Sequence, residues 1–271
     1  MRRITLCLMV FVCLSSKAQT LHAPLSIPYI KTNTYSSAHI DAFSLVGNQA
    51  ALAALKNFSV GAYGERRFML ADLSSYCLAF GLPAASGNFG VQANYFGSAS
   101  YNQSQLGLAY ARNLGKVDVG AQFNYHQIKI AGYGNASAIN FEAGAILHVS
   151  EQFQTGVHIY NPTRVSISKN GDEKLPIVYS FGMGYDVSDK FFIGVEIEKT
   201  EDQPINVNAG LQYAFDEKLF VRVGVASATS SFYLGVGFLW NGLRIDVAAS
   251  LHPSLGVTPG MLLVYNSPAR K

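Results

Sequence analysis

Four histidines of this chain have the side chains for acid–base or metal chemistry, but their spacing argues against both. His126, His148, His158 and His252 lie in four separate segments. A zinc-binding helix places two histidines four residues apart, and these histidines lack that spacing. The chain also has no phosphate-binding loop and no nucleophile elbow. We therefore predict that the protein is not an enzyme and holds no metal and no cofactor.

Charged residues in the middle of the predicted segments share one parity, which is the pattern of a polar interior. They are Glu65, Asp118, Glu142, Glu196, Glu198, Arg222, Arg244 and Asp246. An Arg or Lys that faces lipid at mid-membrane costs about 2–4 kcal/mol, so these groups must face inward if the segments cross a bilayer. Two interpretations stay open. The charges form structural ion pairs that fill the interior, or they line a polar path or a binding surface.

The segments that carry these residues alternate strictly between apolar and other side chains. Residues 117–125, 139–147, 207–215 and 243–251 each repeat with a period of two. Such alternation indicates a strand with one apolar face and one polar face. Strands of soluble proteins usually span about 5–6 residues, whereas membrane-spanning strands need about 9–11. The pattern therefore predicts transmembrane strands.

The whole chain divides into about fourteen such strands, an even number as expected for an outer-membrane barrel. We predict them at 57–66, 74–83, 88–97, 104–113, 116–128, 137–149, 152–161, 175–186, 190–199, 205–216, 218–227, 231–240, 243–252 and 258–266. Tight turns alternate with longer connections, and aromatic residues gather at the strand ends. Outer-membrane barrels share both features, with short turns on the periplasmic side. Both termini should then be periplasmic.

The first 18 residues have the features of a secretory signal peptide. Arg2 and Arg3 precede an apolar run that is too short to span a bilayer, and cleavage is expected after Ala18. The chain has 20 basic and 17 acidic residues, and three of the basic residues lie before the cleavage site. The mature chain is therefore formally neutral, which gives no basis for a nucleic-acid partner. Cys77 alone remains after cleavage, so no internal disulfide is possible.

Residues 19–56 do not alternate and are predicted to plug the barrel. Asn48 can cap a short helix that reaches Leu55, and Asp41 can cap an earlier turn. The helix is apolar nearly all round, so it should be buried at the periplasmic mouth. The predicted plug residues are Asp41, Asn48, Ala50, Leu52 and Leu55. Many glycines share the inward parity and make space either for this plug or for a ligand.

The stretch from Asp41 to Ala53, followed by a strand that begins near Phe58, resembles the start of the long-chain fatty-acid transporter (FadL) superfamily. There an Asp-Ala segment leads to Asn-Pro-Ala-Gly-Leu-Ala and then to the first strand. Gln49 and Ala51 stand where that motif has proline and glycine. The stretch is also similar to the PorV/PorQ barrels of the type IX secretion system of Bacteroidota. The resemblance implies an all-β, fourteen-stranded antiparallel transmembrane barrel over residues 57–271 with an N-terminal plug.

The resemblance also implies two alternative functions for a barrel in the outer membrane. A FadL-like barrel passively transports or binds small, apolar molecules. A PorV/PorQ-like barrel instead docks proteins exported by the type IX secretion system. The expected partners are therefore outer-membrane lipid together with either a small apolar ligand or exported proteins. An apolar cavity or a lateral gap would favour transport, and exposed apolar loops would favour docking.

Overall fold

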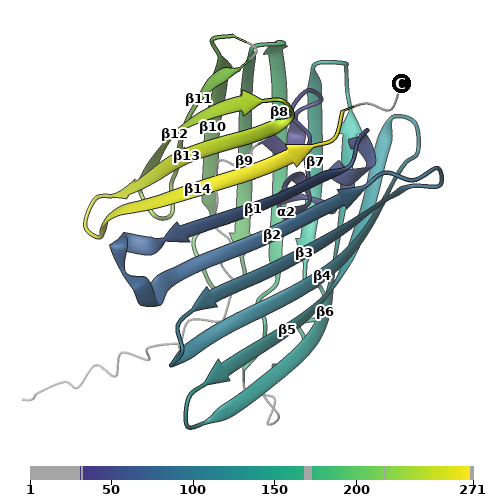
Figure 1. The fold of residues 1–271 in the computed structure, drawn as a ribbon. Coiled ribbons are helices and arrows are strands. Elements are labelled where there is room, and N and C mark those ends of the chain that lie inside the picture. Colours follow the sequence, from purple (N-terminus) through teal and green to yellow (C-terminus); the bar gives the residue numbers. More distant parts are fainter. Residues whose placement is uncertain (1–30, 32, 168–172, 217, 269–271) are drawn as a thin grey trace, which may run out of the picture.

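The computed structural model describes residues 31, 33–167, 173–216 and 218–268, and the predicted signal peptide lies outside them. Fourteen antiparallel strands close into one barrel, in which β1 pairs with β14 (Figure 1). The strands are β1 (Ser59–Arg66), β2 (Ser74–Leu82), β3 (Asn88–Gly97), β4 (Tyr101–Asn113), β5 (Val117–Ile130), β6 (Gly134–His148), β7 (Phe153–Tyr160), β8 (Val178–Ser188), β9 (Phe191–Thr200), β10 (Asn206–Ala214), β11 (Leu219–Ala226), β12 (Ser231–Trp240), β13 (Leu243–His252) and β14 (Gly256–Asn266).

The alternation in the sequence therefore predicted the fold correctly. Every strand is present, and its ends differ from the predicted ones by at most three residues. Among the described residues, no helix is long and apolar enough to cross a membrane.

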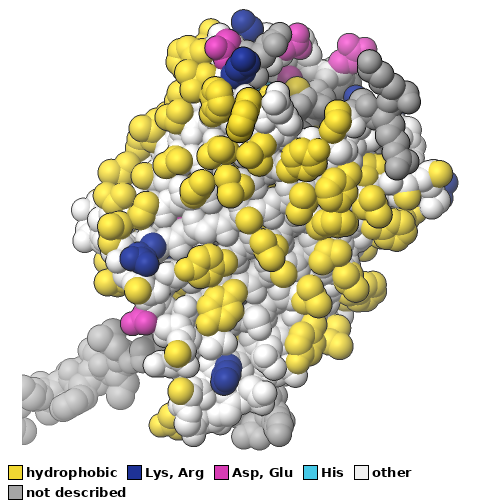
Figure 2. Space-filling model, viewed as in Figure 1, with side chains coloured by type: hydrophobic (Ala, Val, Ile, Leu, Met, Phe, Trp, Pro, Cys, Tyr) yellow, Lys and Arg dark blue, Asp and Glu magenta, His cyan; other side chains and the backbone are white. Residues whose placement is uncertain are grey.

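Burial along the strands is the reverse of that in a soluble protein. Gln122 is fully buried and Glu196 is 1% exposed, whereas Phe123 is 65% and Ile139 is 66% exposed. Figure 2 shows apolar side chains spread over the outer wall. An apolar outside and a polar inside are stable only where lipid surrounds the barrel, and closure leaves no unpaired sheet edge in the lipid.

The two ends of the barrel differ in their connections. At one end, which we call the turn end, the strands are joined by 83–87, 114–116, 149–152, 189–190, 215–218 and 241–242. The other end, the loop end, carries the remaining connections, of which 161–177 is the longest. Aromatic pairs mark the turn end, with ring centroids 5.1 Å apart for Phe89 and Tyr110 and 6.5 Å apart for Phe153 and Tyr185. These pairs match the aromatic clusters predicted at the strand ends.

The N-terminal segment lies inside the barrel toward the turn end. It contains η1 (Asn33–Tyr35), α2 (Ser44–Gly47) and η2 (Gln49–Ala54), and it packs mainly against β4, β5, β6 and β8. The predicted helix after Asn48 is present as the 3-10 helix η2, and the Asn48 side chain accepts a hydrogen bond from the backbone N–H of Ala50, as expected of a cap. Asp41 accepts a hydrogen bond from the Phe43 N–H at 2.7 Å and so fixes the turn before α2.

The described parts of connection 161–177 pack against the inner wall at the loop end. β6 begins at Gly134 but pairs with β7 only from Glu142 to His148. Beyond that level, Ile167 and Leu175 of the connection pack against the inward side chains of Ile128 and Ala138. The connection therefore turns apolar residues into the barrel rather than toward solvent. Two further short helices, η3 (Arg67–Met69) and η4 (Ala71–Leu73), lie in the loop between β1 and β2.

Candidate functional site

The ring of Tyr35 sits in a slot lined by two glycines of the wall, and a third glycine faces its backbone carbonyl. Tyr35 is fully buried, and a Cβ atom on Gly156 or Gly182 would lie closer than 3 Å to the ring, whereas one on Gly184 would meet the Tyr35 carbonyl oxygen. A Cβ contact below 3 Å cannot form without displacing the neighbouring atom. These glycines on β7 and β8 therefore make space for the N-terminal segment. Tyr35 was absent from the predicted plug residues, because a single aromatic residue outside a repeating pattern gives no signal in the sequence.

The predicted plug residues all lie against the inner wall. Ala50 packs over Gly120, whereas Leu52 and Leu55 pack over Gly81. The Asn48 amide donates to the carbonyl oxygen of Val157 at 3.0 Å. The wall also reaches inward: the Asn88 amide donates to the carbonyls of Leu52 and Leu55 at 2.6 and 2.8 Å. Both ends of η2 are therefore hydrogen-bonded to strands.

Ion pairs link the N-terminal segment to β11 and β13. The Asp41 carboxylate lies 2.8 Å from the Arg244 guanidinium. Arg244 also approaches Asp246 at 3.3 Å, and Asp246 pairs with Arg222 at 2.6 Å. These four side chains are largely buried, so each charge needs its partner.

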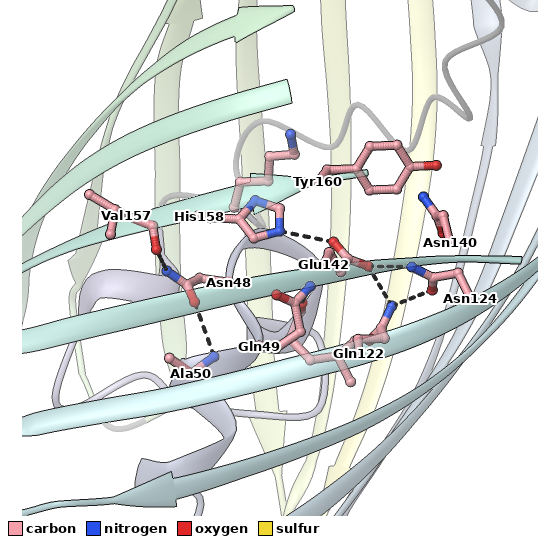
Figure 3. Close-up of polar contacts among 12 residues, drawn as sticks. Asn48, Gln49, Ala50, Gln122, Asn124, Asn140, Glu142, Val157, His158 and Tyr160 are labelled. Carbon is pink, nitrogen blue, oxygen red and sulfur yellow. Dashed lines mark hydrogen bonds and ion pairs between the residues drawn. The ribbon is translucent and has the colours of Figure 1, made fainter. Parts of the chain in front are cut away.

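Glu142 is the centre of a second polar group, on β5, β6 and β7 (Figure 3). Its carboxylate accepts hydrogen bonds from Gln122 at 2.7 Å and from Asn124 at 2.8 Å, and it lies 2.9 Å from His158 Nε2. Side chains of the two neighbouring strands thus surround one buried carboxylate, which is the arrangement that makes such a charge tolerable.

Lys31 and two glutamates of β9 form a third group. The Lys31 ammonium lies 2.7 Å from Glu198 and 4.0 Å from Glu196. The remaining two predicted residues lie apart: Glu65 accepts a hydrogen bond from Tyr63 and pairs with Arg67, and Asp118 contacts His148 at 2.7 Å. The structure therefore places all eight predicted charges on the inner wall, but in five separate groups rather than one cluster. Among the described residues, no three His, Cys, Asp or Glu side chains are grouped to hold a metal ion.

Three cavities of the lumen are lined by described residues and lie between these groups. A mid-lumen cavity of about 60 Å³ is bordered by Lys31, Glu142, His158 and Glu198. A cavity of about 160 Å³ toward the loop end shares Lys31 with it and is also bordered by Glu65 and His252. A third cavity of about 460 Å³ lies at the turn end, beside His39 and Arg244. All three have polar groups in their walls.

A larger and more apolar pocket lies on the lipid-facing side of the wall. This groove has a volume of about 600 Å³ and crosses β6 to β9. Ala143 and Ala145 are small where other strands carry large outward side chains, so the surface is hollowed there. The groove is lined by Ala143, Gly144, Ala145, Val157, His158, Ile159, Tyr179, Ser180, Phe181, Ile197, Lys199 and Ile205. His158 and Ser180 also border the mid-lumen cavity, so a single layer of strands separates the two spaces.

The described residues therefore define a class of protein: a closed, fourteen-stranded β-barrel with an apolar exterior, a polar interior and a plug made by its own N-terminal segment.

Two of the solved structures that share this fold are named as channels, and a third is named as a FadL homologue. The CymD monoaromatic hydrocarbon channel matches with a TM-score of 0.62 and 12% identity, over 84% of this chain and 93% of that one. A deletion mutant of the TodX monoaromatic hydrocarbon channel matches with a TM-score of 0.65 and 11% identity, over 86% of this chain and 96% of that one. A FadL homologue of Pseudomonas aeruginosa matches with a TM-score of 0.58 and 11% identity, over 87% and 96%.

These matches confirm the predicted fold, a fourteen-stranded barrel of the FadL-like kind. No protein-family model matches the sequence, and no curated protein matches it. The likeness to PorV/PorQ stays a prediction.

Proposed function

We propose that this protein is an outer-membrane barrel that binds small apolar molecules and lets them pass without an energy source. The fold is that of channels named for monoaromatic hydrocarbons and of a FadL homologue. The tight turns at one end support a periplasmic turn end. The C-terminal strand β14 also ends at the turn end, where the N–H of Ser267, just after β14, donates to the carbonyl of Phe58, just before β1. Lys31, the first described residue, lies in the lumen, so a periplasmic N-terminus stays a prediction.

The lipid-facing groove carries this proposal. An apolar molecule dissolved in the bilayer gains little by entering a polar lumen, but it can fill an apolar hollow of about 600 Å³ that opens to the lipid. Phe181 and Tyr179 supply aromatic surface, and Ala145 supplies the space. The groove and the mid-lumen cavity share a wall at His158 and Ser180, so a molecule in the groove is separated from the lumen by one layer of strands.

Binding of 4-fluorotoluene to the full mature chain in lipid nanodiscs tests the proposal. We expect a saturable ¹⁹F NMR signal that empty nanodiscs lack. Ala145→Trp should abolish it, because an indole fills the space that the two alanines leave. Ala93→Trp is the matched control, since Ala93 faces outward on β3 and does not line the groove. A bound signal that survives Ala145→Trp, or that Ala93→Trp removes equally, would contradict the assignment to the groove.

One observation favours the second candidate, the docking of exported proteins. The tips of three loop-end connections expose apolar side chains: Met69 is 63%, Tyr133 is 91% and Leu255 is 54% exposed. A docking barrel would bury them against its partner. A photocrosslinker at Tyr133 should then capture exported proteins in native membranes, and one at Glu151 on the turn end should not. A crosslinker at Tyr133 that captures only lipid would count against docking and leave the first proposal intact.

A further inference from the structure

Two carboxylates, of Glu142 and Glu198, border the mid-lumen cavity, and Glu196 lies beside Glu198 on β9. Glu142 is satisfied by Gln122, Asn124 and His158. Glu196 differs: it is 1% exposed, and within the described residues no donor has good hydrogen-bond geometry at either carboxylate oxygen, the nearest candidate being the Asn208 amide opposite it on β10. Burying an ionised carboxylate without hydrogen-bond donors costs roughly several kcal/mol, unless a cation or a proton neutralises its charge.

The cation that the structure supplies is the Lys31 ammonium. It comes from the N-terminal segment and lies 2.7 Å from Glu198 and 4.0 Å from Glu196. Burial alone lowers the pKa of Lys31, but Glu198, Glu196 and Glu142 outweigh that effect and leave its pKa above the usual value. One ammonium thus faces the two carboxylates of β9, and its positive charge also attracts the carboxylate of Glu142.

The cavity beside Lys31 has further acceptors. Gln92, Asn94, Gln105 and Tyr160 line it together with Glu142 and Glu198. The Asn94 side-chain oxygen is buried and has no donor among the described residues. An alkylammonium carries three N–H donors, of which Lys31 directs one to Glu198. A volume of about 60 Å³ is enough for a few atoms beyond the lysine.

We propose that this mid-lumen cavity is a binding site for the primary ammonium group of a small amine, and that Lys31 is its tethered natural occupant. The Glu198 carboxylate on the cavity wall provides the charge together with Glu196, which lies behind the lining and 4.0 Å from the ammonium, and the amide oxygen of Asn94 provides a further acceptor. The ligand of this site is a cation, whereas that of the lipid-facing groove is apolar. The site lies on the inner face of the wall, whereas the groove lies on the outer face. Its occupation also couples to the plug, because a free amine competes with the N-terminal segment for the same carboxylates.

Chemical rescue of a lysine deletion tests this inference. Lys31→Ala removes three carbons and the ammonium, which is the composition of n-propylammonium. In the variant, amide hydrogen exchange of residues 33–35 should become faster, because the segment has lost its ion pair. Saturating n-propylammonium should slow that exchange at least tenfold, whereas tetramethylammonium, which has the charge but no N–H donor, and propanol, which lacks the charge, should not.

Two comparisons fix the assignment. Adding Glu196→Gln and Glu198→Gln to Lys31→Ala should eliminate the rescue, since both carboxylates are then neutral. Equal slowing by tetramethylammonium, or no slowing by n-propylammonium, overturns the proposal. If Lys31→Ala does not assemble, the wild type gives a second readout: n-propylammonium should compete with Lys31 and speed exchange of the same amides, and unchanged exchange up to molar amine overturns the proposal. Fluorotoluene binding is independent of all these outcomes.

Discussion

Tyr35→Ala should release the N-terminal segment from the barrel wall. The ring is fully buried, and the slot that holds it exists because Gly156 and Gly182 have no side chains. Truncating a buried aromatic residue to alanine costs about 3–5 kcal/mol, because apolar contacts are lost and a cavity remains. The slot is formed by backbone in two paired strands, so it cannot collapse around the smaller residue. We therefore expect a cost within this range.

The cost falls on docking rather than on the barrel, because Tyr35 lies outside the strands. Since about 1.4 kcal/mol changes an equilibrium tenfold, the undocked population should rise roughly 100- to 4,000-fold. Hydrogen exchange of the amides in η1 and η2 measures this population in nanodiscs. The strands β7 and β8 should keep their protection. In planar bilayers the variant should also open more often than the wild type.

Tyr35→Phe is the matched control. The Tyr35 hydroxyl makes no hydrogen bond to the described residues, so its removal should change exchange less than tenfold. Gly182→Leu tests the slot from the other side, because a side chain there meets the ring at 2.0 Å and should release the segment as Tyr35→Ala does. Exchange in Tyr35→Ala within threefold of the wild type would show that the glycine slot does not hold the plug, and the reasoning would be wrong.

Three further predictions concern the same segment. Burial, aided by the positive charges of Arg222 and Arg244, lowers the pKa of His39 from 6.5 to about 4. The released histidine therefore binds a proton that the docked one does not. Docking should weaken as the pH falls from 6.5 to 4 and should change no further below pH 4. His39→Phe should remove this pH dependence of hydrogen exchange. Asp41→Ala leaves the Arg244 guanidinium without its plug partner and should increase undocking at least tenfold, whereas Asp41→Glu should restore part of the docking. Asn88→Ala removes the donor to two carbonyls at the end of η2, and should cost about 1–3 kcal/mol of docking without altering the heat-modifiable migration of the barrel.

The strands could be predicted because lipid imposes a simple rule on each of them. Side chains must alternate between lipid and lumen, so every strand carries its own signal, independent of its neighbours. The errors lie where that rule ends. β6 begins three residues before its predicted start, because its polar residues there still pair with β5 beyond the apolar band. β8 begins at Val178 rather than 175, because Leu175 turns inward to join Ile128 and Pro176 has no N–H to donate.

The charged side chains of the inner wall were predictable, but the residues with which they form ion pairs were not. Parity assigned Glu196 and Glu198 to the lumen correctly, yet nothing in the local pattern connects them with Lys31, which lies 165 and 167 positions earlier in the sequence. One indication was present. The inward charges comprised six carboxylates and two guanidiniums, so cations had to come from outside the strands. Lys31 of the N-terminal segment and Arg67 of η3 supply two of them, whereas Asp118 and Glu142 contact His148 and His158 of the strands themselves.

The inward glycines show why a barrel of this width needs both a plug and large inward rings. Eight-stranded barrels are filled by side chains alone, and barrels of about 16–18 strands leave a water-filled channel. Fourteen strands enclose a lumen between these limits. On β5 to β8, glycines such as Gly120, Gly144 and Gly182 make space for the N-terminal segment, as one interpretation of the sequence held.

On the opposite wall the glycines serve another purpose. Gly210 and Gly224 accommodate the ring of Tyr233, and Gly237 accommodates that of Phe220, so the wall fills itself there. The lumen is therefore closed by a removable segment on one side and by fixed aromatic rings on the other. Undocking the plug should then open the lumen beside β1 to β8, against which the segment packs, but not the part that the rings of Tyr233 and Phe220 fill. The strands β6 to β8 of that wall also border the lipid-facing groove, so the plug and the groove can act on the same passage.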